Sequence, residues 1–144
     1  RRWNVLPGPG GELRLAGLNG ELWERGSPTK ALCTARRQPH HAPEPTCRCG
    51  LYAHHPWATD DLGPLRFGPF MVQGIVQAWG CVQLHRTGFR AQWAEPVALF
   101  LIGHGPETEF GELIGRLAST HGAEVRCFAD LTEARNKTAY GRTG

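Results

Sequence analysis

Apolar and polar residues alternate along 71–84, and this alternation is the clearest structural signal in the chain. The even positions form one face of small apolar residues, from Val72 to Leu84, while the odd positions include Gln73, Gln77 and Trp79. Alternation with a period of two is typical of a β-strand, because successive side chains point to opposite sides of a sheet. The pattern predicts one long strand over 71–84.

The next residues predict the second arm of a hairpin. A tight turn is expected at 85–88, and Phe89, Ala91 and Trp93 then share one face of a returning strand. Proline has no N–H to donate, so we expect Pro96 to interrupt the pairing or to mark a sheet edge. The apolar run at 97–102 reads as a buried strand, which completes a long hairpin over 71–102.

Other segments supply shorter strands and one convincing helix. The first thirty residues read as short strands separated by Gly-rich turns, and 123–128 as a further strand. Helical spacing over 107–121 places five apolar side chains on one face: Phe110, Leu113, Ile114, Leu117 and Ala118. A short helix from Asp130 is compatible with the sequence, and residues 136–144 are expected to form a frayed tail.

These elements predict an α+β fold within one domain, residues 1–135. We expect a mostly antiparallel, twisted sheet or partial barrel, with one packed helix and a zinc-stapled loop. A length of 144 residues is sufficient for one hydrophobic core. No apolar run approaches the roughly 18 residues of a membrane helix. The chain has neither an initiator Met nor a signal peptide, so we expect a trimmed or fragmentary cytoplasmic protein that does not bind membranes.

The segment 31–57 has no periodicity and gathers Pro, His and Cys residues. Structural Zn²⁺ takes four tetrahedral ligands, usually Cys thiolates and His nitrogens. An odd number of cysteines, five in all, argues against a disulfide framework. The spacing C-x7-H-x5-C-x-C predicts a zinc site formed by Cys33, His41, Cys47 and Cys49. The fourth ligand has three alternatives: His40, His54 and His55.

Charge and glycine placement agree with a metal site. Three thiolates and one Zn²⁺ sum to a net charge of −1, and Arg36, Arg37 and Arg48 lie close enough in sequence to offset it. Gly50 permits a tight turn after the C-x-C pair. A Cys47–Cys49 redox pair and an unliganded loop remain as alternatives. We expect Cys127 to be a buried apolar residue and Cys81 to be half exposed.

Catalytic zinc is not indicated by any motif. The chain lacks HExxH, and its Cys and Glu spacing differs from that of the nucleobase deaminases. A second surface is of interest, because Trp79, His85, Arg90 and Trp93 could form a binding face on the hairpin. The simpler interpretation of those residues is an ordinary half-solvated sheet face.

The segments RGSPTKALC, HAPEPTCRCGLYA and VQAWGCVQLHRTGFRAQW resemble a group of small, uncharacterised actinobacterial-type proteins. That group shares a Cys…His…Cys-x-Cys-Gly cluster and a Trp-Gly…His…Gly-Phe-Arg-Ala hairpin. The resemblance spans roughly residues 1–125, and the chain departs from the pattern at Arg25 and Cys81. It implies that the Cys/His cluster is a shared feature, and it implies no activity. It carries over onto Cys33, His41, Cys47, Cys49, Gly50, Tyr52, Trp79, Gly80, His85, Gly88, Arg90 and Ala91.

The function expected from these observations is that of a small zinc-stabilised interaction module, an accessory or regulatory protein with a protein partner. One alternative is a nucleic-acid-binding protein that uses the Arg residues near the zinc loop. An excess of Arg, Ala, Gly and Pro is also what a GC-rich genome produces, so a net charge of +3 gives this alternative little support. A second alternative is an enzyme with an open zinc site or a reactive Cys.

Overall fold

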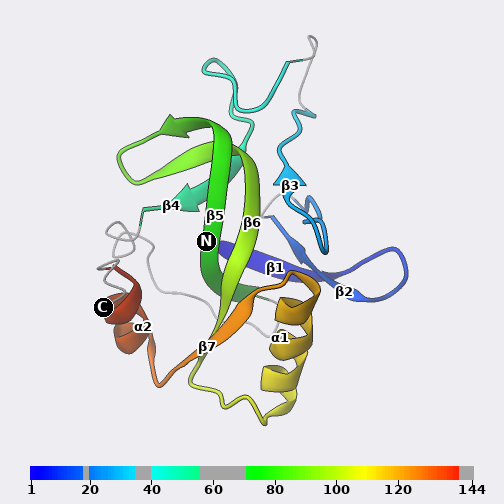
Figure 1. The fold of residues 1–144 in the computed structure, drawn as a ribbon, viewed down its shortest axis with the longest axis vertical. Coiled ribbons are helices and arrows are strands. Elements are labelled where there is room, and N and C mark those ends of the chain that lie inside the picture. Colours follow the sequence, from blue (N-terminus) through cyan, green and yellow to red (C-terminus); the bar gives the residue numbers. More distant parts are fainter. Residues whose placement is uncertain (18–19, 35–39, 56–70, 140–144) are drawn as a thin grey trace.

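The computed structural model describes residues 1–17, 20–34, 40–55 and 71–139 (Figure 1). Within these residues, seven strands form one open, mostly antiparallel sheet, and two helices accompany it, so the expected α+β class is confirmed. The sheet order is β2-β1-β5-β6-β3, with β4 and β7 also paired to β6. The elements are β1 (Arg2–Pro7), β2 (Leu13–Ala16), β3 (Thr29–Lys30), β4 (Leu51–His54), β5 (Met71–Leu84), β6 (Gly88–Ile102), α1 (Glu109–Thr120), β7 (Glu124–Phe128) and α2 (Leu131–Ala139).

Strand β6 organises the sheet. It pairs with β5 along one edge, and β4, β3 and β7 follow one another along the opposite edge. Only β7 is parallel to it. The predicted long hairpin of β5 and β6 is therefore present, and every other described strand except β2 is paired directly to one of its two arms.

The expectation for Pro96 holds in part, because the strand does not end there but its pairing with β5 is interrupted beside it. Strand β6 runs through Pro96, which faces Val76 of β5, and the register shifts between Ile75 and Val76. The shift leaves Val97 as an extra residue on β6, because Ile75 faces Ala98. A β-bulge of this kind accommodates proline inside a sheet, since a regular ladder hydrogen bond is not required there.

A second bulge changes the faces of the hairpin. Trp79 faces Trp93 and Val82 faces Ala91, so Gly80 and Cys81 together lie opposite one residue of β6. Gly80 has a φ of 80°, the left-handed conformation that a glycine-type bulge requires. The alternation moves by one residue at this point. The side chains of β5 therefore lie on the predicted faces as far as Trp79. Beyond the bulge, Val82 lies on the same face of the sheet as Trp79.

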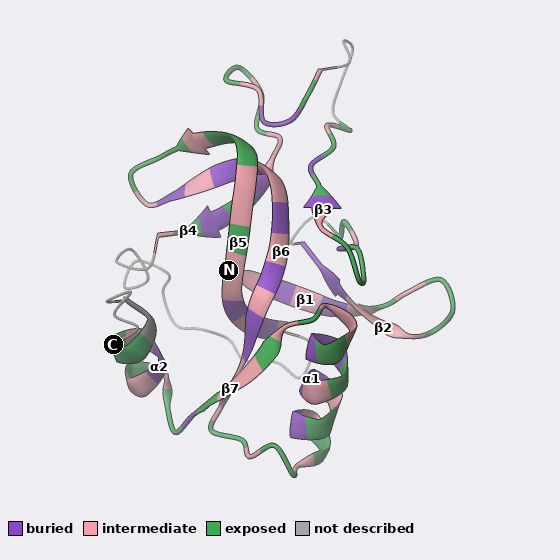
Figure 2. Cartoon of the chain, viewed as in Figure 1, coloured by how far each residue is buried: buried purple, intermediate pink, exposed green. Residues whose placement is uncertain are grey.

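The core lies where β1, β2, β5 and β6 meet α1. Trp3 and Trp23 are fully buried and pack edge to face, with ring centroids 5.4 Å apart. Helix α1 begins after Thr108, whose side chain accepts a hydrogen bond from the Gly111 N–H. Its buried face turns toward the sheet in Figure 2 and includes Ile114 and Leu117. The helix predicted over 107–121 is thus confirmed, with its described bounds at 109–120.

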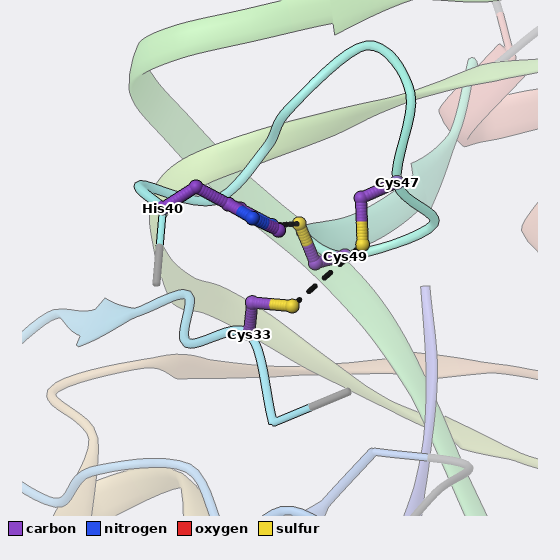
Figure 3. Close-up of side chains that lie close together, drawn as sticks. All are labelled: Cys33, His40, Cys47 and Cys49. Carbon is purple, nitrogen blue, oxygen red and sulfur yellow. Dashed lines mark hydrogen bonds between the residues drawn. The ribbon is translucent and has the colours of Figure 1, made fainter. Parts of the chain in front are cut away.

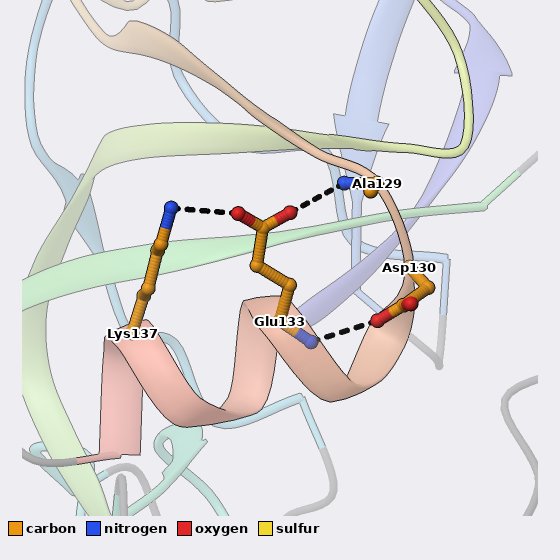
Figure 4. A network of polar contacts seen from close by, with 4 residues as sticks. All are labelled: Ala129, Asp130, Glu133 and Lys137. Atoms are coloured by element: carbon orange, nitrogen blue, oxygen red, sulfur yellow. Dashed lines mark hydrogen bonds and ion pairs between the residues drawn. The ribbon is translucent and has the colours of Figure 1, made fainter.

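A second helix follows β7, where the sequence was compatible with a short helix from Asp130. The Asp130 carboxylate accepts a 2.8 Å hydrogen bond from the Glu133 N–H, and the Glu133 carboxylate accepts one from the Ala129 N–H (Figure 4). Lys137 pairs with Glu133 at 2.6 Å. Helix α2 continues to Ala139, beyond the expected start of the tail, and residues 140–144 lie outside the described residues. Within the described part of the chain, no helix has the length and apolar character needed to span a membrane.

Candidate metal centre

Four side chains converge beside the hairpin. Cys33, His40, Cys47 and Cys49 each offer one ligand atom, and these atoms all lie within 4.8 Å of one another (Figure 3). The Cys33 and Cys47 sulfurs are 3.6 Å apart. The Nε2 atom of His40 is 3.3 Å from the Cys49 sulfur. Three cysteines and one histidine thus point into one small volume.

The separations fit four ligands of one ion. Zn–S bonds of about 2.3 Å and Zn–N bonds of about 2.05 Å in a tetrahedron place ligand atoms about 3.5 to 3.8 Å apart. A disulfide requires about 2.05 Å between sulfurs. Cys33 and Cys47 are much farther apart than that, and all five cysteines are free. The cluster therefore has a donor set that is compatible with a thiolate-rich metal site, and two of its separations are close to the tetrahedral values.

The strands around β6 bring these ligands together. Cys33 follows β3, and the Ala31 N–H donates to the Gln92 carbonyl of β6 at 2.7 Å. Cys49 lies two residues before the start of β4. The ladder between β4 and β6 begins where Leu51 faces Ala91. Both halves of the site are consequently anchored on one strand, although 14 residues separate Cys33 from Cys47.

The turn that follows the C-x-C pair depends on a glycine. Gly50 has a φ of 125°, and a Cβ atom there would lie 2.9 Å from the Arg90 Cβ and 3.1 Å from the Pro43 Cβ. The preceding turn is held by the Cys47 N–H, which donates to the Glu44 carbonyl at 3.0 Å. The Gly expected after the C-x-C pair is thus required for close packing as well as for backbone conformation.

The histidine of the cluster is His40. The predicted ligand His41 is exposed and lies outside the cluster. The buried residues Ala42 and Pro43 anchor the chain immediately after it, and the two adjacent histidines present their side chains to different surroundings. His54 is exposed, and His55 contacts the His85 carbonyl at 2.9 Å. Spacing alone could not choose between neighbouring histidines.

Hydrogen bonding and burial affect the thiols differently. Hydrogen bonding to the Cys49 backbone, supported by the neighbouring Cys33, Cys49 and His40 side chains, lowers the pKa of Cys47 to about 7. Burial raises the pKa of Cys49. Because a metal binds the thiolate, the lowered pKa of Cys47 favours the form of this side chain that a metal requires near neutral pH.

Arg90 contacts the cysteine loop, and its sequence position alone does not reveal this contact. It is 5% exposed, and its guanidinium donates to the carbonyls of Cys47 and Cys49. The predicted binding face is therefore divided. Trp79 and Trp93 face each other on one side of the hairpin, whereas Arg90 is paired with Gln83 on the other side. His85 is exposed, but its Nε2 atom accepts from the Arg90 Nε–H at 3.2 Å.

Two further expectations differ from the structure. Cys127 is exposed near the end of β7, whereas the sequence predicted a buried apolar residue, and β7 pairs with β6 alone. Cys81 is also exposed. Of the arginines expected to offset the thiolate charge, Arg48 is exposed, and Arg36 and Arg37 lie outside the described residues.

The cluster forms part of the wall of an open groove of about 1800 Å³. All four candidate ligands line it, as do Leu32 and Tyr52, whose side chains are 76% and 46% exposed. Comparison with known proteins adds no relative: no protein-family model, no curated protein and no solved structure matches this chain. The resemblance to the group of actinobacterial-type proteins stays a prediction.

Proposed function

We propose that this protein is a small interaction module stabilised by one structural zinc ion, bound by Cys33, His40, Cys47 and Cys49. The observation that carries the proposal is the convergence of four ligand atoms within 4.8 Å of one another. Three thiolates and an imidazole are a donor set that structural Zn²⁺ uses widely. The chain around these ligands is held in place by its neighbours in the sheet, so the site is preorganised for the ion.

A structural role follows from the number of protein ligands. Four protein donors complete a tetrahedral coordination sphere and leave no position for a catalytic water. The ion would link the segment after β3 to the segment before β4, two parts of the chain whose buried apolar residues include the small side chains of Ala31 and Ala42. Metal binding would then supply free energy that packing does not supply locally.

An interaction role is supported by the surface next to the cluster. Two of the large apolar side chains that are exposed in the described residues, Leu32 and Tyr52, line the same groove as the ligands. Exposed apolar side chains gathered in one groove are typical of contact sites for other proteins. We therefore favour a protein partner, with zinc fixing the shape of the surface that the partner contacts.

Nucleic acid is the alternative partner, since Arg48 is exposed between two of the ligands. Binding to nucleic acid would weaken steeply as the salt concentration rises, because phosphate contacts release counterions. A gel-shift or anisotropy titration with a mixed single- and double-stranded pool, at low and moderate salt, distinguishes the two. No binding at low salt eliminates the nucleic-acid alternative.

The metal itself is tested by elemental analysis of protein purified without added metal. We expect about one zinc per chain, loss of metal in Cys49→Ser, and full retention in Cys81→Ser, whose cysteine is exposed outside the cluster. Removal of the ion with a chelator should lower the melting temperature of the wild type and leave Cys49→Ser unchanged. A wild type that binds no metal even when supplied with zinc would refute the proposal.

A further inference from the structure

Arg90 is a buried cation with four neutral hydrogen-bond acceptors. Its guanidinium donates to the carbonyl oxygens of Cys47 and Cys49, to the side-chain carbonyl of Gln83 and to the Nε2 atom of His85. Its exposed fraction is 5%. Each acceptor satisfies a donor of the guanidinium fork, but none of them carries a negative charge.

No carboxylate forms an ion pair with Arg90 among the residues that the structure describes. The ring of Tyr52 is a further neighbour, with its centroid 5.9 Å from the guanidinium carbon. Burial of a charged group is strongly unfavourable unless an opposite charge compensates for it. A nearby anionic group would compensate for this burial, and Arg90 donates to the backbone carbonyls of the two cysteines in the C-x-C turn.

We propose that Arg90 is the counter-cation of the metal centre and a positioning residue for its ligands. This inference rests on the proposed zinc site. One Zn²⁺, three thiolates and a neutral imidazole sum to a net charge of −1, which one guanidinium neutralises. Arg90 thereby favours the three-thiolate form of the site, and its forked hydrogen bonds fix the two carbonyls on either side of Arg48.

The same geometry couples the metal centre to the tip of the hairpin. Gln83 lies on β5, His85 lies in the turn, and both accept hydrogen bonds from the side chain that holds the cysteine loop. Arg48 provides the matched contrast. It lies between the two cysteines in sequence, yet it is exposed, and water screens its charge from the site.

The test compares the zinc affinity of Arg90→Met, Arg90→Lys and Arg48→Met by competition with a chromophoric chelator. We expect Arg90→Met to bind zinc about 10- to 100-fold more weakly than the wild type, as is usual for loss of an outer-shell partner. Arg48→Met should change the affinity less than about threefold, because its charge is exposed. Arg90→Lys retains the charge but loses the fork, so it should recover at least half of the loss on a logarithmic scale.

The outcomes separate this inference from the proposal that it rests on. If the wild type binds no zinc, the metal site fails. If the wild type binds zinc and Arg90→Met binds it equally well, the metal site stands and the counter-cation role is refuted. Equal losses in Arg90→Lys and Arg90→Met would also refute it, because a purely structural side chain would give that result. Should Arg90→Met fail to fold, Arg90→Gln, which keeps a neutral donor, replaces it in the same comparison with Arg90→Lys.

Discussion

The Nε2 atom of His40 lies 3.3 Å from the sulfur of Cys49, while the side chain of His41 is exposed to solvent. The two histidines are adjacent and chemically identical, so the sequence offers a matched pair of variants at one site. Only the first is placed to complete a three-cysteine donor set.

Replacement of His40 by Ala should therefore lower the zinc affinity by more than tenfold, since even outer-shell changes cost about 10- to 100-fold. His41→Ala should bind zinc like the wild type. Competition with a chelator measures both affinities, and substitution of Co²⁺ for zinc reports whether tetrahedral coordination survives. A loss confined to His41→Ala would assign the fourth ligand to His41 instead.

Thiol reactivity gives a second, independent prediction. Cys81 and Cys127 are exposed outside the cluster, whereas Cys33, Cys47 and Cys49 are its members. Metal coordination protects thiolates from alkylation, so zinc-loaded protein should label rapidly at Cys81 and Cys127 alone. After treatment with a chelator, all five cysteines should label. Mass spectrometry of the modified peptides counts them.

Rapid labelling of a cluster cysteine in zinc-loaded protein would instead favour the reactive-cysteine alternative. The variant Cys81→Ser serves as the control for assignment, because it should remove one rapidly labelled thiol without changing the zinc content.

The hairpin and the first helix could be predicted because each follows from a local period. The alternation over 71–84 and the helical spacing over 107–121 are both properties of neighbouring residues. The bulges could not be placed in the same way. They depend on which residues of β6 face Gly80 and Ile75, and that register is set by the whole sheet.

The candidate site was predictable in composition and only partly in detail. Cys33, Cys47 and Cys49 stand out because cysteine is rare and clustered in this chain. The choice of His40 over His41 depends on backbone direction in an irregular segment, where no period exists. Arg90 lies 41 residues from Cys49, so its contact with the cluster exists only in the folded sheet. A buried arginine opposite a cysteine loop is a tertiary feature that spacing does not encode.

Substitution of glycine by alanine should have opposite effects on stability at two positions of α1, Gly111 and Gly115. A Cβ atom on Gly111 would lie 2.9 Å from the Cα atom of Pro106 and would collide with the Gly105 carbonyl, whereas nothing lies within 4 Å of a Cβ on Gly115. Gly111→Ala should lower the free energy of unfolding by about 1 to 3 kcal/mol, because the atoms in the way belong to the backbone. Gly115→Ala should raise it by roughly 0.5 to 1 kcal/mol through helix propensity.

Urea denaturation of both variants beside the wild type measures the two changes. Both variants carry the same substitution in the same helix. The difference between their changes in unfolding free energy therefore isolates the local packing around Gly111. Changes of the same sign in both variants would contradict the placement of α1 against the residues before it.

We predict that the folded state loses stability in acid in part because of His121, the residue that follows α1. Burial, together with the positive charges of Arg14 and Arg25, lowers the pKa of His121 to about 4. Its Nε2 atom is buried and has no hydrogen-bond partner in the described part of the chain. An unfolded chain has an ordinary histidine pKa of about 6.5, so between pH 6.5 and 4 the unfolded state binds a proton that the folded state does not.

The stability of the folded state should therefore decrease as the pH falls through that window, and His121 should contribute nothing above it. The side chain is only half-buried, so solvent screening reduces its contribution to roughly 1 to 2 kcal/mol at pH 4. His121→Gln removes the titrating group, and its unfolding free energy should fall less steeply between pH 6.5 and 4 than that of the wild type. Both proteins carry the same Cys/His cluster, so protonation of the metal ligands affects both curves and cancels in their difference. Parallel curves for the two proteins would show that His121 is protonated as readily in the folded state as in the unfolded state.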